Sequence, residues 1–235
     1  MQRFHEAQKL HADSSAMPPL FQTDVFKGVY HILTEEVGAG EAKALLLESF
    51  LWDPMFHRPT WEPERFSLRD AGDSNHYKKI FDDMVPFICL FHRLNDKYGE
   101  ERAQYITALL AVPVGVPYLA KTFTPIANIQ DIDQFRQMLA NYLGDGQGFE
   151  WTVEVSDDKT SVRYHFTRCV YIEVLRAYGL TYAAMMSCYC DHVIFDNAMP
   201  EIYFSRDHCK GVGDSYCDHC FKIRTPEDTR LDGDR

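Results

Sequence analysis

The spacing of apolar residues changes near residue 147, and this change constrains the fold more than any other feature of the chain. From Leu20 to Gly144, apolar residues recur at three- and four-residue intervals, which predicts amphipathic helices. From Phe149 to Ser156, apolar and polar residues alternate strictly, which predicts a half-buried strand. A run of helices followed by strands favours an α+β fold over a parallel, doubly wound sheet.

Residues 20–146 are predicted to form a helical region. Ser74 is expected to cap a helix that contains Pro86 and ends at Gly99, and further helices are expected at 100–111 and 131–143. Residues 1–19 and 225–235 lack apolar periodicity, so we expect a frayed N-terminus and a flexible tail.

Residues 147–224 are predicted to form an α+β domain with an antiparallel sheet, on which the helical region packs. The turn at 157–159 should join two strands in a hairpin. The element order β-β-α-α-β-β is expected from strands at 149–156 and 162–167, helices at 170–178 and 181–195, and strands at 202–206 and 216–223.

The composition excludes several classes of partner. A net charge of −11 and a pI near 5.3 argue against a nucleic-acid ligand, which needs a basic face. The sequence has neither a secretory signal nor an apolar run of the ~18 residues that a membrane span needs. We therefore expect a soluble, cytoplasmic protein that acts on a small molecule, and a homo-oligomer stays compatible with the sequence.

The chemistry should lie in the last third of the chain, which holds six of the seven cysteines. In a reducing compartment such thiols are metal ligands or reactive groups rather than disulfides. On a helix, Cys188, Asp191 and His192 stand at i, i+3 and i+4 and share a face. On the last strand, Cys217 and His219 share a face that should point to the core.

A closed zinc site formed by Cys188, Cys190, Cys217 and Cys220 is an alternative. An extended strand cannot turn both sulfurs of Cys217 and Cys220 towards one ion, so this site would require a turn at that point. Glycine-rich phosphate loops, the G-x-S-x-G elbow and the H-E-x-x-H motif do not occur in the sequence.

Four short runs, Phe166–Tyr171, Tyr178–Leu180, Cys188–Asp191 and Gly213–Asp218, together resemble the L-2-amino-thiazoline-4-carboxylic acid hydrolase family. The resemblance implies an enzyme that opens a small nitrogen- and sulfur-containing ring by hydrolysis. It points to Cys169, Cys188, Asp191 and Cys217 as the positions that match the family pattern. The domain also resembles the 4-vinyl reductase type of small-molecule-binding domain, whose members include sensors.

Our leading hypothesis is a hydrolase of a C–N bond in a cyclic amidine, thiazoline or lactam. Without a metal, Cys169 or Cys188 would attack the ring carbon while Asp191 or His192 moves protons. With zinc, Cys169, Cys188 and Cys217 would hold the ion and leave one position open.

Substrate binding is assigned to His219, His165 and Arg163, although the shared strand face of His165 and Arg163 favours a solvent-facing position for both. The competing hypotheses are a sensory module that binds a ligand without catalysis, and a structural zinc protein.

Overall fold

The computed structural model describes residues 24–123, 131–143, 148–197, 201–225 and 228. The predictions for residues 1–19 and for most of 225–235 lie outside these ranges. The helical region comprises α2 (Asp24–Val37), α3 (Ala39–Leu47), a π-helical turn (Glu48–Trp52), α4 (Asp53–Phe56), α5 (Ala71–Tyr98), α6 (Glu100–Phe123) and α7 (Ile132–Leu143).

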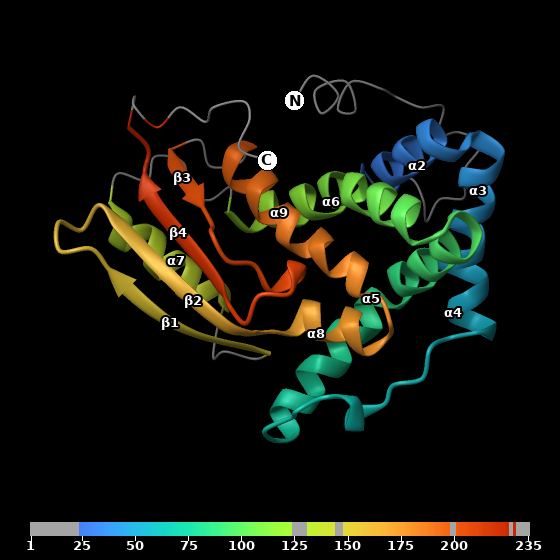
Figure 1. The fold of residues 1–235 in the computed structure, drawn as a ribbon, viewed down its shortest axis with the longest axis horizontal. Coiled ribbons are helices and arrows are strands. Elements are labelled where there is room, and N and C mark those ends of the chain that lie inside the picture. Colours follow the sequence, from blue (N-terminus) through green and yellow to red (C-terminus); the bar gives the residue numbers. More distant parts are fainter. Residues whose placement is uncertain (1–23, 124–130, 144–147, 198–200, 226–227, 229–235) are drawn as a thin grey trace.

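The sheet region begins with β1 (Phe149–Val155) and β2 (Ser161–Cys169) and continues with α8 (Val170–Ala177), α9 (Ala184–Asn197), β3 (Ile202–Ser205) and β4 (Cys217–Ile223). The strands form one antiparallel sheet in the order β1-β2-β4-β3 (Figure 1). The predicted α+β fold and the β-β-α-α-β-β order are therefore confirmed.

The start of α5 differs from the sequence prediction. Its N-cap is Asp70 rather than Ser74, and the Asp70 carboxylate accepts a hydrogen bond from the backbone N–H of Asp73 at 2.9 Å. Asp and Ser are both good capping residues. Because α5 begins at Ala71, Asp70 occupies the N-cap position and Ser74 lies within the helix. As predicted, the helix passes through Pro86 and ends before Gly99.

Helix α6 is longer than predicted, because it continues through Pro113 and Pro117 to Phe123. Packing explains part of this result, since α6 contacts both α2 and α9. A methyl group on Gly28 of α2 would lie 2.4 Å from Cβ of Pro113, so Gly28 allows the two helices to approach closely at that proline. No helix in the described parts of the chain is long and apolar enough to cross a membrane.

One face of the sheet is covered by α7 and α9 (Figure 1). Phe135 of α7 and Phe195 of α9 both contact the ring of Phe221 on β4, with ring centroids 4.7 and 4.8 Å apart. The inward residues of β2 are Val162, Tyr164 and Phe166, as the alternation predicts. This arrangement leaves a sheltered space between the sheet and the helices.

Strand β1 is less buried than its alternation indicates. It is an edge strand, and Val153 and Val155 are 41% and 40% exposed. Helix α7 contacts β2, and α9 contacts β3 at the edge of the sheet opposite β1.

Candidate functional site

A cavity of about 420 Å³ lies between the sheet and the helices α5, α8 and α9. Its walls are mostly apolar and aromatic, and include Phe87, Phe149, Phe166, Ile172, Met186, Phe195 and Phe221. The same cavity is lined by the polar residues Cys188, Asp191, Cys217 and His219. An apolar hollow with a few convergent polar groups is the usual form of a small-molecule site.

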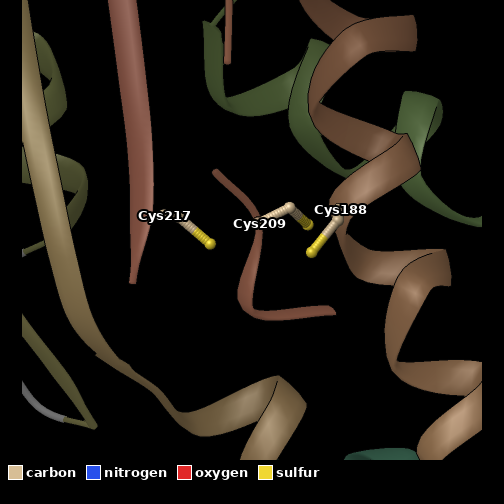
Figure 2. A group of neighbouring side chains, drawn as sticks. All are labelled: Cys188, Cys209 and Cys217. Atoms are coloured by element: carbon tan, nitrogen blue, oxygen red, sulfur yellow. The ribbon is translucent and has the colours of Figure 1, made fainter. Parts of the chain in front are cut away.

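Three cysteine sulfurs meet beside this cavity. Cys188 lies on α9, Cys209 on the loop between β3 and β4, and Cys217 at the start of β4, and their sulfurs all lie within 4.8 Å of one another. Figure 2 shows the three side chains approaching from these separate segments. The alternation of β4 directs Cys217 inward, as predicted, together with His219 and Phe221.

The loop that carries Cys209 is shaped to bring its sulfur close to the other two. A short 3-10 turn, Lys210–Val212, follows Cys209, and the backbone N–H of Lys210 donates a hydrogen bond to Sγ of Cys217 at 3.1 Å. A methyl group at Gly211 would lie only 2.7 Å from Sγ of Cys188. The turn can therefore pack against α9 only because position 211 has no side chain.

The three thiols share their protons unequally. Hydrogen bonds from Cys188 and Cys217 lower the pKa of Cys209, and the nearby guanidinium of Arg206 acts in the same direction. The same hydrogen bonds and burial raise the pKa of Cys188. Hydrogen bonds among the sulfurs therefore couple the protonation of the three thiols, and the guanidinium of Arg206 favours negative charge on Cys209.

Asp191 lies one helical turn from Cys188. Its Oδ2 accepts a hydrogen bond from Nη1 of Arg206 at 3.1 Å, and Nη2 of Arg206 donates to the carbonyl oxygen of Cys188 at 3.1 Å. Burial nevertheless raises the pKa of Asp191 to about 7. A carboxyl group with such a pKa can both give and take a proton near neutral pH.

His219 faces the same carboxylate, with Nε2 3.7 Å from Oδ2 of Asp191. This buried nitrogen has no hydrogen-bond partner within the described residues. Burial lowers the pKa of His219 to about 3, so the imidazole is neutral at ordinary pH. A ligand in the cavity could therefore hydrogen-bond to Nε2 without displacing a partner.

Cys169 also lines the cavity, but it is not part of the sulfur cluster. Burial raises the pKa of Cys169 to about 12. The predicted trio of Cys169, Cys188 and Cys217 is thus replaced by Cys188, Cys209 and Cys217. The sequence does contain a signal for Cys209, because Gly211 and Gly213 between two cysteines indicate a tight turn that returns the chain.

The structure does not bring three other predicted site residues to the cavity wall. The ring of His192 packs against Phe204, with centroids 4.8 Å apart. Arg163 and His165 lie on the opposite face of β2 from Phe166, since alternate residues of a strand point to opposite sides. Nη1 of Arg163 lies 3.9 Å from the carboxylate of Asp218 on that outer face.

The closed zinc site considered from the sequence does not form among the described residues. Sγ of Cys190 donates a hydrogen bond to the carbonyl oxygen of Ala111 on α6 at 3.1 Å. Cys220 lies on the opposite face of β4 from Cys217. The cysteines that come together in the described chain are Cys188, Cys209 and Cys217.

These three sulfurs have a spacing that suits a metal ion. Zinc bound tetrahedrally by thiolates at about 2.3 Å separates the sulfurs by about 3.8 Å. The separation of Cys188, Cys209 and Cys217, within 4.8 Å, needs only a small adjustment to reach this value. Three thiolates would leave a fourth coordination position for water or a ligand.

Comparison with known proteins gives one family match and two structural likenesses. The model of the L-2-amino-thiazoline-4-carboxylic acid hydrolase family matches residues 77–221, which is more than half of the chain. No curated protein matches. An H-NOX protein from S. oneidensis in the Fe(II)NO ligation state is 11% identical with a TM-score of 0.35, covering 84% of this chain and 98% of its own. A triple mutant of an H-NOX protein from S. oneidensis in the Fe(II) state is 11% identical with a TM-score of 0.38, covering 88% and 98%.

Proposed function

Because the chain belongs to the L-2-amino-thiazoline-4-carboxylic acid hydrolase family, we propose that it hydrolyses a C–N bond of a small nitrogen-containing ring, of the amidine, thiazoline or lactam type. The observation that carries the proposal is the meeting of Asp191 with the sulfur cluster at one apolar cavity. This arrangement offers a nucleophile, a proton carrier and a largely apolar hollow for the ring.

In the metal-free form of the mechanism, Cys188 is the nucleophile. It lines the cavity one helical turn from Asp191, whose carboxylate accepts its proton as the Cys188 sulfur attacks the ring carbon. Asp191 then gives this proton to the ring nitrogen as the C–N bond breaks. Water adds to the same carbon and gives one proton to Asp191. The C–S bond breaks as Asp191 returns that proton to Cys188.

In the metal-bound form, Cys188, Cys209 and Cys217 would hold zinc. The ion would supply a Lewis acid and a bound water of lowered pKa. Asp191 keeps the same role in this form, because it moves a proton beside the reacting ring. Arg206 positions Asp191 through their hydrogen bond in both forms.

Activity measurements on variants test the proposal. Candidate cyclic amidines, thiazolines and lactams are offered to the wild type and to Asp191→Asn and Cys188→Ser, with Cys220→Ser as the control on the far face of β4. We expect each of the two site variants to lose about 100-fold or more in kcat and the control to keep its activity. Normal activity in folded Asp191→Asn would rule out its role as the proton carrier.

Metal analysis separates the two forms of the mechanism. Bound zinc is measured in the wild type, in Cys209→Ser and in Cys220→Ser. Zinc in the wild type and in Cys220→Ser, but not in Cys209→Ser, would support the metal-bound form. Full activity in metal-free protein after chelation would support the thiol form.

A sensory module is the second candidate function, and the largely apolar lining of the cavity favours it. In this case a small molecule binds in the same place and no bond is broken. Tight binding with no turnover of any ring offered, in wild-type protein of known metal content, would select the sensor over the hydrolase.

A further inference from the structure

We propose that Cys209 and Cys188 form a reversible disulfide in the presence of a peroxide, and that this bond switches the site off. Formation of the disulfide requires no catalytic activity of the protein, and only its effect on turnover rests on the proposed function. The inference follows from the placement of the clustered thiols, of which one is partly exposed and two lie at the cavity wall.

Cys209 is the member of the sulfur cluster that the metal-free mechanism does not use. Cys188 and Cys217 are buried and line the cavity, whereas Cys209 is partly exposed and is not part of the cavity wall. Its sulfur nevertheless lies within 4.8 Å of both other sulfurs. Cysteines that sense oxidants combine access to solvent with a neighbouring thiol that resolves the first oxidation product. Cys209 meets both conditions.

The packing of the turn favours Cys188 over Cys217 as the partner of Cys209. Figure 2 shows the sulfurs of Cys188 and Cys209 pointing toward each other, while Cys217 approaches from β4. Sγ of Cys217 accepts a hydrogen bond from the backbone N–H of Lys210 at 3.1 Å, which holds it at the strand. Sγ of Cys188 lies against the turn itself, 2.7 Å from the place of a methyl group at Gly211.

The remaining approach of the two sulfurs requires only a local movement. A disulfide brings its sulfurs to about 2 Å from each other. Cys209 lies on the loop between β3, which ends at Ser205, and β4, which begins at Cys217. Rotation of the Cys209 side chain and a shift of this loop therefore leave the strand pairing unchanged.

Hydrogen peroxide supplies the oxidising equivalents. The sulfur of Cys209 attacks one peroxide oxygen, so that an S–O bond forms, the O–O bond breaks and one water leaves, which gives a sulfenic acid. Sγ of Cys188 then attacks the Cys209 sulfur, so that the S–S bond forms and the S–O bond breaks. The hydroxyl group leaves as water with the proton of the Cys188 thiol. The two thiols lose two electrons, and one peroxide gains them and becomes two waters.

The disulfide withdraws Cys188 from the chemistry of the cavity. In the metal-free form its sulfur attacks the ring carbon, and in the metal-bound form it is a zinc ligand. Both roles require a free thiol or thiolate. A dithiol such as dithiothreitol restores the two thiols by exchange and becomes a cyclic disulfide itself.

Peptide mapping after peroxide treatment of the full chain identifies the bonded cysteines. A chelator is present, so that no bound ion holds the thiols. Trypsin places Cys209 on peptide 207–210 and Cys188 on peptide 177–206. We expect a link between these two peptides as the main product, and its loss with dithiothreitol. A main link from Cys209 to the peptide that carries Cys217, or no linked product of Cys209, would overturn the inference.

Two matched variants assign the bond to one sulfur. Peptide 177–206 also carries Cys190, whose Sγ donates a hydrogen bond to the carbonyl oxygen of Ala111 and lies outside the cluster. We expect Cys190→Ser to keep the link and Cys188→Ser to lose it. A link to peptide 177–206 that persists in Cys188→Ser would overturn the inference. Fragmentation of the linked wild-type peptides assigns the sulfur even where a variant fails to fold.

Turnover is scored separately, with each protein compared with its own activity before oxidation. We expect the wild type to lose at least about tenfold and to recover with dithiothreitol, and Cys209→Ser to stay within about twofold. Equal losses in the two proteins would reject the switch and leave the hydrolase intact. A mapped disulfide in a protein whose reduced form hydrolyses no ring would reject the hydrolase and leave the disulfide intact.

Discussion

Gly211 allows the turn that follows Cys209 to lie against α9, because the chain passes there within van der Waals distance of the helix. Its absent side chain would lie 2.7 Å from Sγ of Cys188 and 3.3 Å from the carbonyl oxygen of Ala184. The second of these neighbours is helical backbone and cannot move aside alone. Glycine, the smallest residue, therefore fits between the turn and α9 at position 211.

Gly211→Ala is therefore expected to lower the free energy of unfolding by about 1–3 kcal/mol, since overpacking forces neighbouring groups to shift. Gly40→Ala is the control, because no heavy atom lies within 4 Å of a methyl group at position 40 in helix α3. Urea unfolding followed by circular dichroism measures both. Equal stabilities of Gly211→Ala and the wild type would show that the turn yields without cost.

Asp73 of α5 forms a buried ion pair with Arg168 of β2, and this pair makes the free energy of unfolding depend on pH. Oδ2 of Asp73 lies 2.7 Å from Nη1 of Arg168, and both side chains are buried. Burial acts to raise the pKa of Asp73, but the hydrogen bonds from Arg69 and Arg168 outweigh it and lower the pKa to about 2 from 3.8. The ionised form is thus favoured by folding.

A lowered carboxyl pKa stabilises the fold above the unfolded-state value and ceases to do so as the pH falls through the folded-state value. We expect Asp73 to contribute about 2 kcal/mol above pH 4 and to lose this contribution as the pH falls from about 4 to about 2. Asp73→Asn should be less stable than the wild type at pH 7, and the difference should narrow over this range. Asp83→Asn, at an exposed pair, is the control. A difference independent of pH would contradict the assignment.

Among the elements, α5 is the helix that connects the two parts of the fold, and its start shows how a cap is chosen. Asp70 satisfies the backbone N–H of Asp73, and Ser74 lies already inside the helix. We expect Asp70→Ala to lower the free energy of unfolding by about 1 kcal/mol and Ser74→Ala to change it little. Thermal unfolding of the two variants measures this, and a larger effect at Ser74 would restore the sequence prediction.

Regular elements of the site could be predicted from the sequence because their side chains follow a period. The two-residue period of β4 placed Cys217 and His219 on the inner face, and the helical period of α9 placed Asp191 beside Cys188. Cys209 lies on a loop, where no period relates one residue to the next, so its arrival at the cluster depends on the packing of the turn against α9.

Periodicity also fails to tell which face of a strand is the functional one. Arg163 and His165 alternate with Tyr164 and Phe166, and only the position of α7 and α9 makes the latter face the inner one. Periodicity alone also does not predict the burial of β1. Its apolar and polar residues alternate strictly, yet its outer half is exposed. The position of β1 at the edge depends on how all four strands pair.

At the scale of the whole molecule, the helical region and the sheet region share one core. The ring of Phe81 on α5 stacks on Tyr178 at 4.8 Å, and the hydroxyl of Tyr182 donates to the carbonyl oxygen of Phe91 at 2.6 Å. Buried apolar residues of both regions belong to one continuous cluster. Neither region could separate without exposing large apolar surfaces to water.

The shared core leads us to expect a single cooperative unfolding transition. Trp61 packs against Phe81 in the helical region, and Trp151 lies on β1 near Phe166, so each reports on one region. In Trp61→Phe, the fluorescence of Trp151 reports on the sheet region, and in Trp151→Phe, the fluorescence of Trp61 reports on the helical region. Trp52 is 54% exposed and is present in both variants. The urea midpoints from fluorescence should coincide with the midpoint from circular dichroism in each variant. Two separated midpoints would show that the regions at 20–146 and 147–224 unfold as independent domains.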